Sequence, residues 1–330
     1  MGATCKGLGI TVTIIALIIG FSSASALAGE NGMQTSFDMA VGASYLSGST
    51  DYQIGGKVVW DNYPLEKIQF PISELDWPLD TFWLTLRGDV KFDRWRIGGK
   101  LQKNLTDDPG DMVDRDWGVY GYPFSWRDTL DIYSETDTEL DGWIFDIYSD
   151  FTFYRVPQWD FFAGLGLTYQ SFDFEGRNTK QWARNPINSV RDYVYVDGNT
   201  IDYEVTYTIP YMRLGTNFTY KDKMGTDRFF MEGSFAYSPI VNAEDEDNHL
   251  LRGKTNKSDT DGDAFIWTFK SRYNFWPHWF LGLNFDYTKI DTDGTSRATF
   301  TGPDAIYNHD IGIELHSTQT QATFEVGYDF

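Results

Sequence analysis

The sequence predicts an all-β protein, a ten-stranded antiparallel transmembrane β-barrel with five long extracellular loops. Aromatic residues make up 17% of the chain, although its mean hydropathy is only −0.40. After residue 28, no stretch is long and apolar enough to form a transmembrane helix. Several segments instead alternate apolar and polar residues with a period of two, as expected of strands that face lipid on one side and a polar lumen on the other.

The first 28 residues are predicted to be a secretory signal peptide. Lys6 is their only charged residue, an apolar run follows from Leu8 to Phe21, and Ala26-Leu27-Ala28 forms a cleavage site between small residues. The alternative is a membrane anchor, but the apolar run is shorter than the roughly 20 residues that a spanning helix needs. The mature protein is then a single domain over 29–330 without cysteine, because Cys5 is the only one.

Ten strands are predicted from the alternation. In the second strand Phe82 and Leu84 lie opposite Trp83 and Thr85, and the last strand ends in Phe330, an aromatic terminus typical of bacterial outer-membrane barrels. Pro78 predicts a bend in the second strand. The predicted strands are 35–48, 70–92, 94–104, 141–154, 160–174, 203–220, 228–240, 264–276, 279–290 and 318–330.

The connections between these strands alternate in length. Short turns, FDRW, RVPQW, KDKMGTD and FWPHWF, alternate with five long connections. Short turns are typical of the periplasmic side and long loops of the outer side, so all five long connections are expected at one outer rim. The predicted loops are 49–69, 105–140, 175–202, 241–263 and 291–317.

The charge balance excludes one class of partner. Without the signal peptide the chain carries 26 Lys and Arg against 48 Asp and Glu, a net charge of −22. Such a surface repels nucleic acid and attracts cationic substrates.

Two acidic groups are expected to face each other across the barrel mouth. Asp114 and Asp116 lie two residues apart in the second long loop, and the fourth loop carries Asp245, Asp247 and His249. A carboxylate beside an imidazole orients it as a general base, and two close carboxylates can share a proton. The flanking carboxylates are also expected to raise the pKa of His249.

Other interpretations of these acidic segments remain open from the residues alone. Both segments can be solvated acidic loops, the first neutralised by Arg115. The stretch that begins at Asp259 resembles a calcium loop, although its Gly262 is fourth instead of sixth and no glutamate closes it.

Five motifs make the chain resemble the omptins, a family of Gram-negative outer-membrane endopeptidases built on ten-stranded barrels. They occur in matching order over essentially the whole mature chain: LSG at 46–48, SELDW at 73–77, MVDRDW at 112–117, IPYMRLG at 209–215 and DNH at 247–249.

The resemblance implies an aspartic-type outer-membrane endopeptidase whose active site faces the cell exterior. Its catalytic couples map onto Asp114 with Asp116 and Asp247 with His249. In this mechanism Asp247 orients His249, which takes a proton from a water held by the first couple. The resemblance implies no metal, no cofactor and no acyl-enzyme.

The P1 pocket and the lipopolysaccharide-binding positions depart from the family pattern. Omptins that cleave between basic residues hold the P1 side chain with a glutamate and an aspartate; Asp245 retains the aspartate, but the glutamate position is Tyr52. The implied substrates are cationic peptides or surface-exposed proteins. The family's lipopolysaccharide-binding basic positions are Asp173 and Thr206 here, which leaves open whether lipopolysaccharide is required. The alternative function is a non-catalytic barrel that serves as a porin or adhesin.

Overall fold

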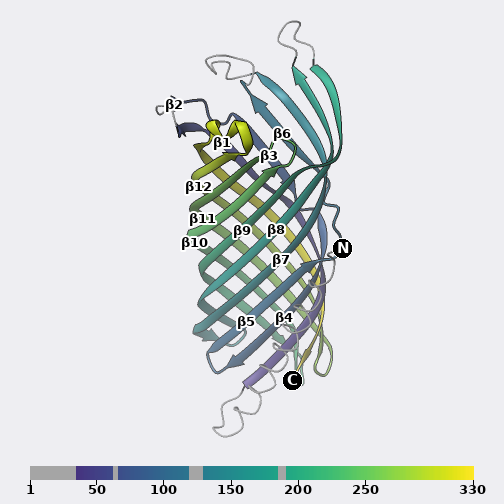
Figure 1. Ribbon diagram of the computed structural model, residues 1–330. Helices are drawn as coiled ribbons and strands as arrows, with labels where there is room; N and C mark the ends of the chain where they lie inside the picture. The colour runs from purple at the N-terminus through teal and green to yellow at the C-terminus, as the bar shows by residue number, and fades with distance from the viewer. Residues whose placement is uncertain (1–34, 62–65, 119–128, 185–190) are drawn as a thin grey trace.

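The computed structural model describes residues 35–61, 66–118, 129–184 and 191–330, and it shows a tilted, closed antiparallel barrel (Figure 1). The predicted signal peptide lies outside the described residues. Among the described residues, no helix is long and apolar enough to cross a membrane.

Ten strands close the barrel, as predicted. Each pairs with its neighbours in the order β1–β4–β5–β7–β8–β9–β10–β11–β12–β13, and β13 pairs with β1 to complete the ring. The strands are β1 (Thr35–Trp60), β4 (Thr81–Phe92), β5 (Trp95–Asn104), β7 (Leu130–Val156), β8 (Trp159–Arg184), β9 (Arg191–Lys221), β10 (Asp227–His249), β11 (Lys254–Trp276), β12 (Trp279–Phe300) and β13 (His309–Asp329).

Three further strands lie at one end of the barrel, the upper end in Figure 1. These are β2 (Glu66–Lys67), β3 (Ser73–Pro78) and β6 (Asp111–Trp117). At this end β3 pairs with β1, and β6 joins β3 to β7, so these two strands continue the wall above β4 and β5. The break between β3 and β4 follows Pro78, where the sequence predicts a bend.

The predicted loops were wrong in extent. Half of 105–140 and most of 175–202, 241–263 and 291–317 is strand, and β10 and β11 are separated only by 250–253. At the upper end the outward face of a strand is polar, as at Asp310 and Glu314 of β13, although the inward face stays apolar, as at Ile313 and Leu315. The apolar outward face that marks a lipid-facing strand is therefore missing while backbone pairing continues. β9 has 31 residues, far more than the roughly 9–11 that a tilted strand needs to cross a membrane.

The outer face below this extension is apolar. Leu165, Leu214, Trp267 and Phe324 are each more than half exposed there. The inward-facing partners on the same strands are polar, as the alternation predicts. A lipid-facing band around a polar interior is the arrangement of a transmembrane barrel.

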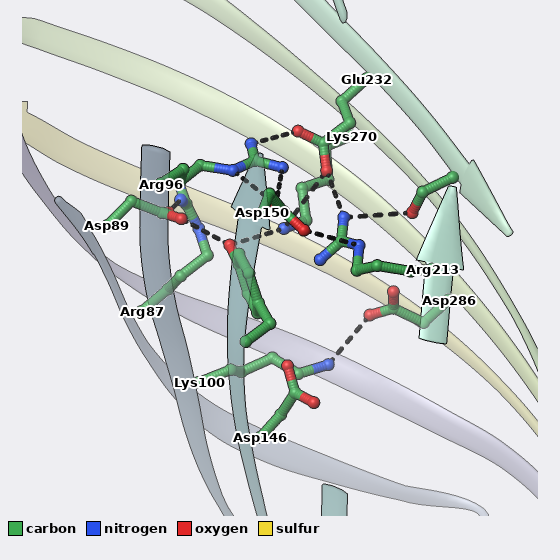
Figure 2. A network of polar contacts seen from close by, with 12 residues as sticks. Arg87, Asp89, Arg96, Lys100, Asp146, Asp150, Arg213, Glu232, Lys270 and Asp286 are labelled. Atoms are coloured by element: carbon green, nitrogen blue, oxygen red, sulfur yellow. Dashed lines mark hydrogen bonds and ion pairs between the residues drawn. The ribbon is translucent and has the colours of Figure 1, made fainter. Parts of the chain in front are cut away.

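The lumen is filled in layers. A charged network lies in its lower part, where Arg96 of β5 contacts Asp150 of β7 and reaches Glu232 of β10 on the far side (Figure 2). Glutamines such as Gln102 and Gln321 bond across the lumen above it. Higher still is a fully buried core of aromatic side chains: Trp77, Trp83, Phe172, Phe174, Tyr203 and Tyr207. The site described next lies directly above this core.

Candidate active site

The carboxylate pair lies on β6, a strand and not the loop that the sequence predicts. Asp114 and Asp116 share the face of buried Met112, which points into the barrel. Arg115 lies on the opposite face and donates to Glu74 at 2.9 Å. Arg115 is therefore engaged elsewhere and does not pair with the two aspartates.

Burial sets the charge of this pair. It raises the pKa of Asp114 well above its ordinary value, and neighbouring Asp116 raises the pKa of Asp114 further. Burial also raises the pKa of Asp116, which Ser73 partly offsets. Oδ1 of Asp114 is buried without a hydrogen-bond partner. The two carboxyl groups are thus suited to share a proton.

A bulge in β10 turns the second acidic group inward. Below the bulge the even-numbered side chains of β10 are buried, as at Glu232 and Ser238; above it the odd-numbered ones are, as at Val241 and Asp247. The register shifts between Ser238 and Val241, where Pro239 has no N–H to donate to the ladder. Without this one extra residue in β10, Asp247 would point away from the lumen.

A tight turn fixes what lies opposite Asp247. The chain reverses over 250–253, and Gly253 adopts the left-handed conformation with φ of 56°. A side chain at this position would also approach Thr301 Oγ1 to 2.5 Å. The turn places Lys254 opposite His249 and Asn256 opposite Asp247.

Asp247 and His249 form a hydrogen-bonded couple. His249 Nε2 lies 3.0 Å from Asp247 Oδ2, and Arg252 approaches His249 Nδ1 at 2.8 Å. Because a guanidinium only donates, Nδ1 accepts and the Nε2 proton points at Asp247. This is the neutral tautomer that leaves Nδ1 as the basic nitrogen.

The predicted rise in the pKa of His249 is wrong. Burial lowers the pKa of His249 below its usual 6.5; Asp247 raises it in part, and Lys254 and Arg252 lower it. The sequence shows the flanking carboxylates, but it shows neither the burial of His249 nor that the turn places these two cations near the imidazole. The imidazole is consequently neutral over a wider pH range, and Asp247 stays ionised with a pKa lowered to about 2.

The structure brings the two couples together at the upper end. Asp247 is close enough to raise the pKa of Asp114, and His249 to lower that of Asp116. Arg252 contacts His249 and lowers the pKa of both aspartates, so it lies near both couples. All four residues predicted to be catalytic therefore lie together at the upper end.

The two predicted substrate-binding residues differ in their surroundings. Asp245 is 7% exposed, its Oδ1 has no hydrogen-bond partner, and burial raises the pKa of Asp245 to about 7. Tyr52 is 2% exposed, and its hydroxyl donates to Asp247 Oδ2 at 2.5 Å. Neither this contact nor that of Asn256 Nδ2 with the same oxygen, at 2.9 Å, was anticipated from the sequence. A turn predicted at 250–253 would have placed Asn256 opposite Asp247.

The positions that correspond to lipopolysaccharide contacts lie on the outer face. Asp173 of β8 is exposed and pairs in register with Glu204 of β9, and Ser171 pairs with Thr206. These register partners on the neighbouring strand are acidic or neutral.

The calcium-loop interpretation is wrong for this chain. Asp259, Asp261 and Asp263 belong to the regular strand β11, where they pair in register with β12. Among the described residues, no three His, Cys, Asp or Glu side chains are grouped so that they could hold a metal ion.

Residues 36–330 match the Omptin family. The chain belongs to the omptin family. It is 29% identical over 227 residues to outer membrane protease OmpP of Escherichia coli K12, covering 64% of this chain and 66% of that protein. It is 25% identical to Protease 7 of Escherichia coli O157:H7, covering 94% and 92%, and 24% identical to the plasminogen activator of Yersinia pestis, covering 86% and 85%.

The fold agrees with this membership. The crystal structure of outer membrane protease OmpT from Escherichia coli superposes with a TM-score of 0.75 at 17% identity, over 89% of this chain and 97% of that one. The predicted fold class, the Gram-negative outer-membrane location and the omptin-type endopeptidase function are confirmed at the level of family and fold. The porin alternative also conflicts with a lumen that is crossed by paired side chains from bottom to top.

Proposed function

We propose that this omptin is an aspartic-type endopeptidase in which Asp247 and His249 activate a water that Asp114 and Asp116 hold. The observation that carries the proposal is the hydrogen-bonded Asp247–His249 couple beside a half-buried carboxyl pair. A base whose second nitrogen can accept a proton and a carboxyl pair that can share one are the two groups that water attack on a peptide requires.

The reaction follows from the tautomer of His249. Nδ1 takes a proton from the water as the water oxygen bonds to the scissile carbonyl carbon. Asp247 stabilises the imidazolium that forms, and the proton held by the Asp114–Asp116 pair stabilises the developing oxyanion. His249 then gives its proton to the leaving amine as the C–N bond breaks. No metal or other cofactor takes part in this scheme.

Arg252 has to release Nδ1 before a water can bind there. Its guanidinium now occupies the basic lone pair of His249, and its side chain is exposed at the turn between β10 and β11. A substrate entering over the carboxylates would displace Arg252 towards solvent.

The site is suited to cationic peptides and exposed segments of proteins. The chain has a net charge of −21, and Asp245 places a buried carboxylate beside the couple. We infer that Asp245 holds a basic P1 side chain through a charge-assisted hydrogen bond. The short turns and Phe330 lie at the end opposite the site; since such turns are periplasmic in this class, the site faces the cell exterior (Figure 1).

Hydrolysis of a fluorogenic peptide with P1 Arg by the refolded protein tests the proposal. Wild type is expected to cleave it, and His249→Ala to lose at least three orders of magnitude in kcat, about the scale seen when a member of a catalytic unit is removed. Heat-modifiable gel mobility confirms that the variant is folded. Near-wild-type turnover by folded His249→Ala would rule out the mechanism.

A further inference from the structure

We propose that Tyr52 is a positioning residue of the Asp247–His249 couple, which it supports from the opposite wall of the barrel. The inference rests on the proposed role of His249 as the base. Tyr52 replaces the glutamate that the family resemblance would place in the P1 pocket, and its contacts assign it to a different task.

One carboxylate oxygen gathers three contacts from three strands. Asp247 Oδ2 accepts from Tyr52 of β1 at 2.5 Å and from Asn256 of β11 at 2.9 Å, and it lies 3.0 Å from His249 Nε2. β1 and β10 are not neighbours in the barrel, so the tyrosine hydroxyl reaches Asp247 across the lumen. The carboxylate is 0% exposed and is therefore held by these groups and not by solvent.

The ring of Tyr52 is fixed by the aromatic core beneath the site. Its centroid is 5.5 Å from that of Tyr203, which stacks on Trp77 at 5.1 Å with an interplanar angle of 11°. Packing of this kind leaves the hydroxyl little freedom to leave Asp247. The core thereby sets the direction in which Oδ2 meets the imidazole.

The hydroxyl remains a donor throughout the working pH range. Burial raises the pKa of Tyr52 well above 10, and the adjacent Asp247 raises it further. A neutral donor beside an ionised carboxylate keeps the Nε2 proton of His249 on the side of Asp247 and Nδ1 free to act as base. Groups that orient a reacting side chain in this way typically contribute about 10- to 100-fold to metal-site activity, and we take the same scale here.

The placement argues against Tyr52 as a wall of the P1 pocket. Only 2% of the residue is exposed, and the hydroxyl is already engaged with Asp247. The P1 side chain would then be recognised by Asp245 without help from Tyr52.

The test is the Tyr52→Phe variant, which removes the hydroxyl and keeps the ring. We expect kcat to fall about 10- to 100-fold, with KM and the preference for P1 Arg over P1 Ala unchanged. The acidic limb of the pH profile should move to higher pH, because an Asp247 anion that has lost a donor attracts the imidazole proton more strongly.

Tyr207→Phe is the matched control. Tyr207 is buried in the same core and its hydroxyl bonds Thr50 at 2.6 Å, away from Asp247. Both variants remove one buried hydroxyl, so only Tyr52→Phe should change kcat and the pH profile, while heat-modifiable mobility reports that both are folded.

The outcomes separate this inference from the proposed function. Inactive His249→Ala combined with wild-type kcat and pH profile in Tyr52→Phe would overturn the positioning role and leave the mechanism standing. A changed KM or P1 preference with unchanged kcat would make Tyr52 a pocket residue and also overturn the inference. Active His249→Ala would instead overturn the proposed function itself.

Discussion

The lower lumen and the upper site use the same residue types with opposite results. In the lower network the buried glutamates contact cations: Glu232 contacts Arg96 and Arg213 (Figure 2). Likewise, Glu325 contacts Arg87. At the upper end Asp245 is buried and Asp114 and Asp116 are half-buried, and the pKa values of all three are raised by burial. The comparison indicates that a buried carboxylate paired with a cation stabilises the fold. A buried carboxylate without a matched cation is instead available for proton transfer or substrate binding.

Removing a carboxylate from the lower network should produce the largest effect on stability. Glu232→Ala leaves Asp150 in contact with the buried guanidinium groups of Arg96 and Arg213 but removes one of the two carboxylates that they share. One buried positive charge is then uncompensated, which typically lowers the free energy of unfolding by about 3–5 kcal/mol. Urea unfolding of the barrel in lipid vesicles measures the loss. The folded fraction should keep its peptidase activity, because the network lies below the aromatic core.

A surface pair provides the control for that measurement. Glu246 bonds the exposed Lys257 at 2.7 Å, and Glu246→Ala should lower the free energy of unfolding by no more than about 1 kcal/mol. If Glu232→Ala lowered the free energy of unfolding no more than Glu246→Ala does, the paired carboxylates of the lower network would not stabilise the barrel. The comparison between this network and the site would then fail.

Neutralising Asp245 should reduce specificity at the site. Asp245→Asn removes the proposed charged partner of a basic P1 residue, so kcat/KM for P1 Arg relative to P1 Ala should fall by about 10- to 150-fold. Glu244→Gln on the exposed face of the same strand is the matched control and should leave the ratio unchanged.

The same preference should depend on pH. Because the pKa of Asp245 is raised to about 7, its carboxylate is protonated below that pH and charged above it. The P1 Arg to P1 Ala ratio of wild type should therefore rise as the pH increases through about 7, and that of Asp245→Asn should stay flat. A rise of equal size in Asp245→Asn would assign the titration to another group.

The smallest expected effect concerns Arg252. This cation lowers the pKa of His249, so Arg252→Gln should move the acidic limb of the kcat/KM profile to higher pH, by about 0.1–0.7 units for an exposed charge. Lys257→Gln, which removes an exposed cation bonded to Glu246, should not move it. A shift to lower pH in Arg252→Gln would contradict the assigned influence of Arg252 on His249.

The lipid-facing strands could be predicted from the sequence, and the strands above them could not. Residues 264–276 alternate apolar and polar side chains because one face meets lipid. Residues 254–263, KTNKSDTDGD, continue the same strand without any such alternation, since both of their faces are polar. The sequence pattern reports the environment of a strand and not its backbone hydrogen bonds.

The candidate site also has features that the sequence predicts and features that it does not. Spacing and motif order predicted Asp114, Asp116, Asp247 and His249, because these features are local. The contact between Tyr52 and Asp247 depends on two strands facing each other across a closed lumen, and the lowered pKa of His249 depends on burial. The spacing of residues along one strand shows neither this contact across the lumen nor this burial.

The most direct test of the central claim is a double-mutant cycle of His249→Ala and Asp114→Asn, read as turnover of a peptide with P1 Arg. If both couples act on one water, each single variant should lose about three or more orders of magnitude and the double variant should be scarcely worse than either. Unchanged heat-modifiable mobility shows that the site and not the barrel was altered. Losses that multiply in the double variant, or substantial turnover without His249, would contradict the account.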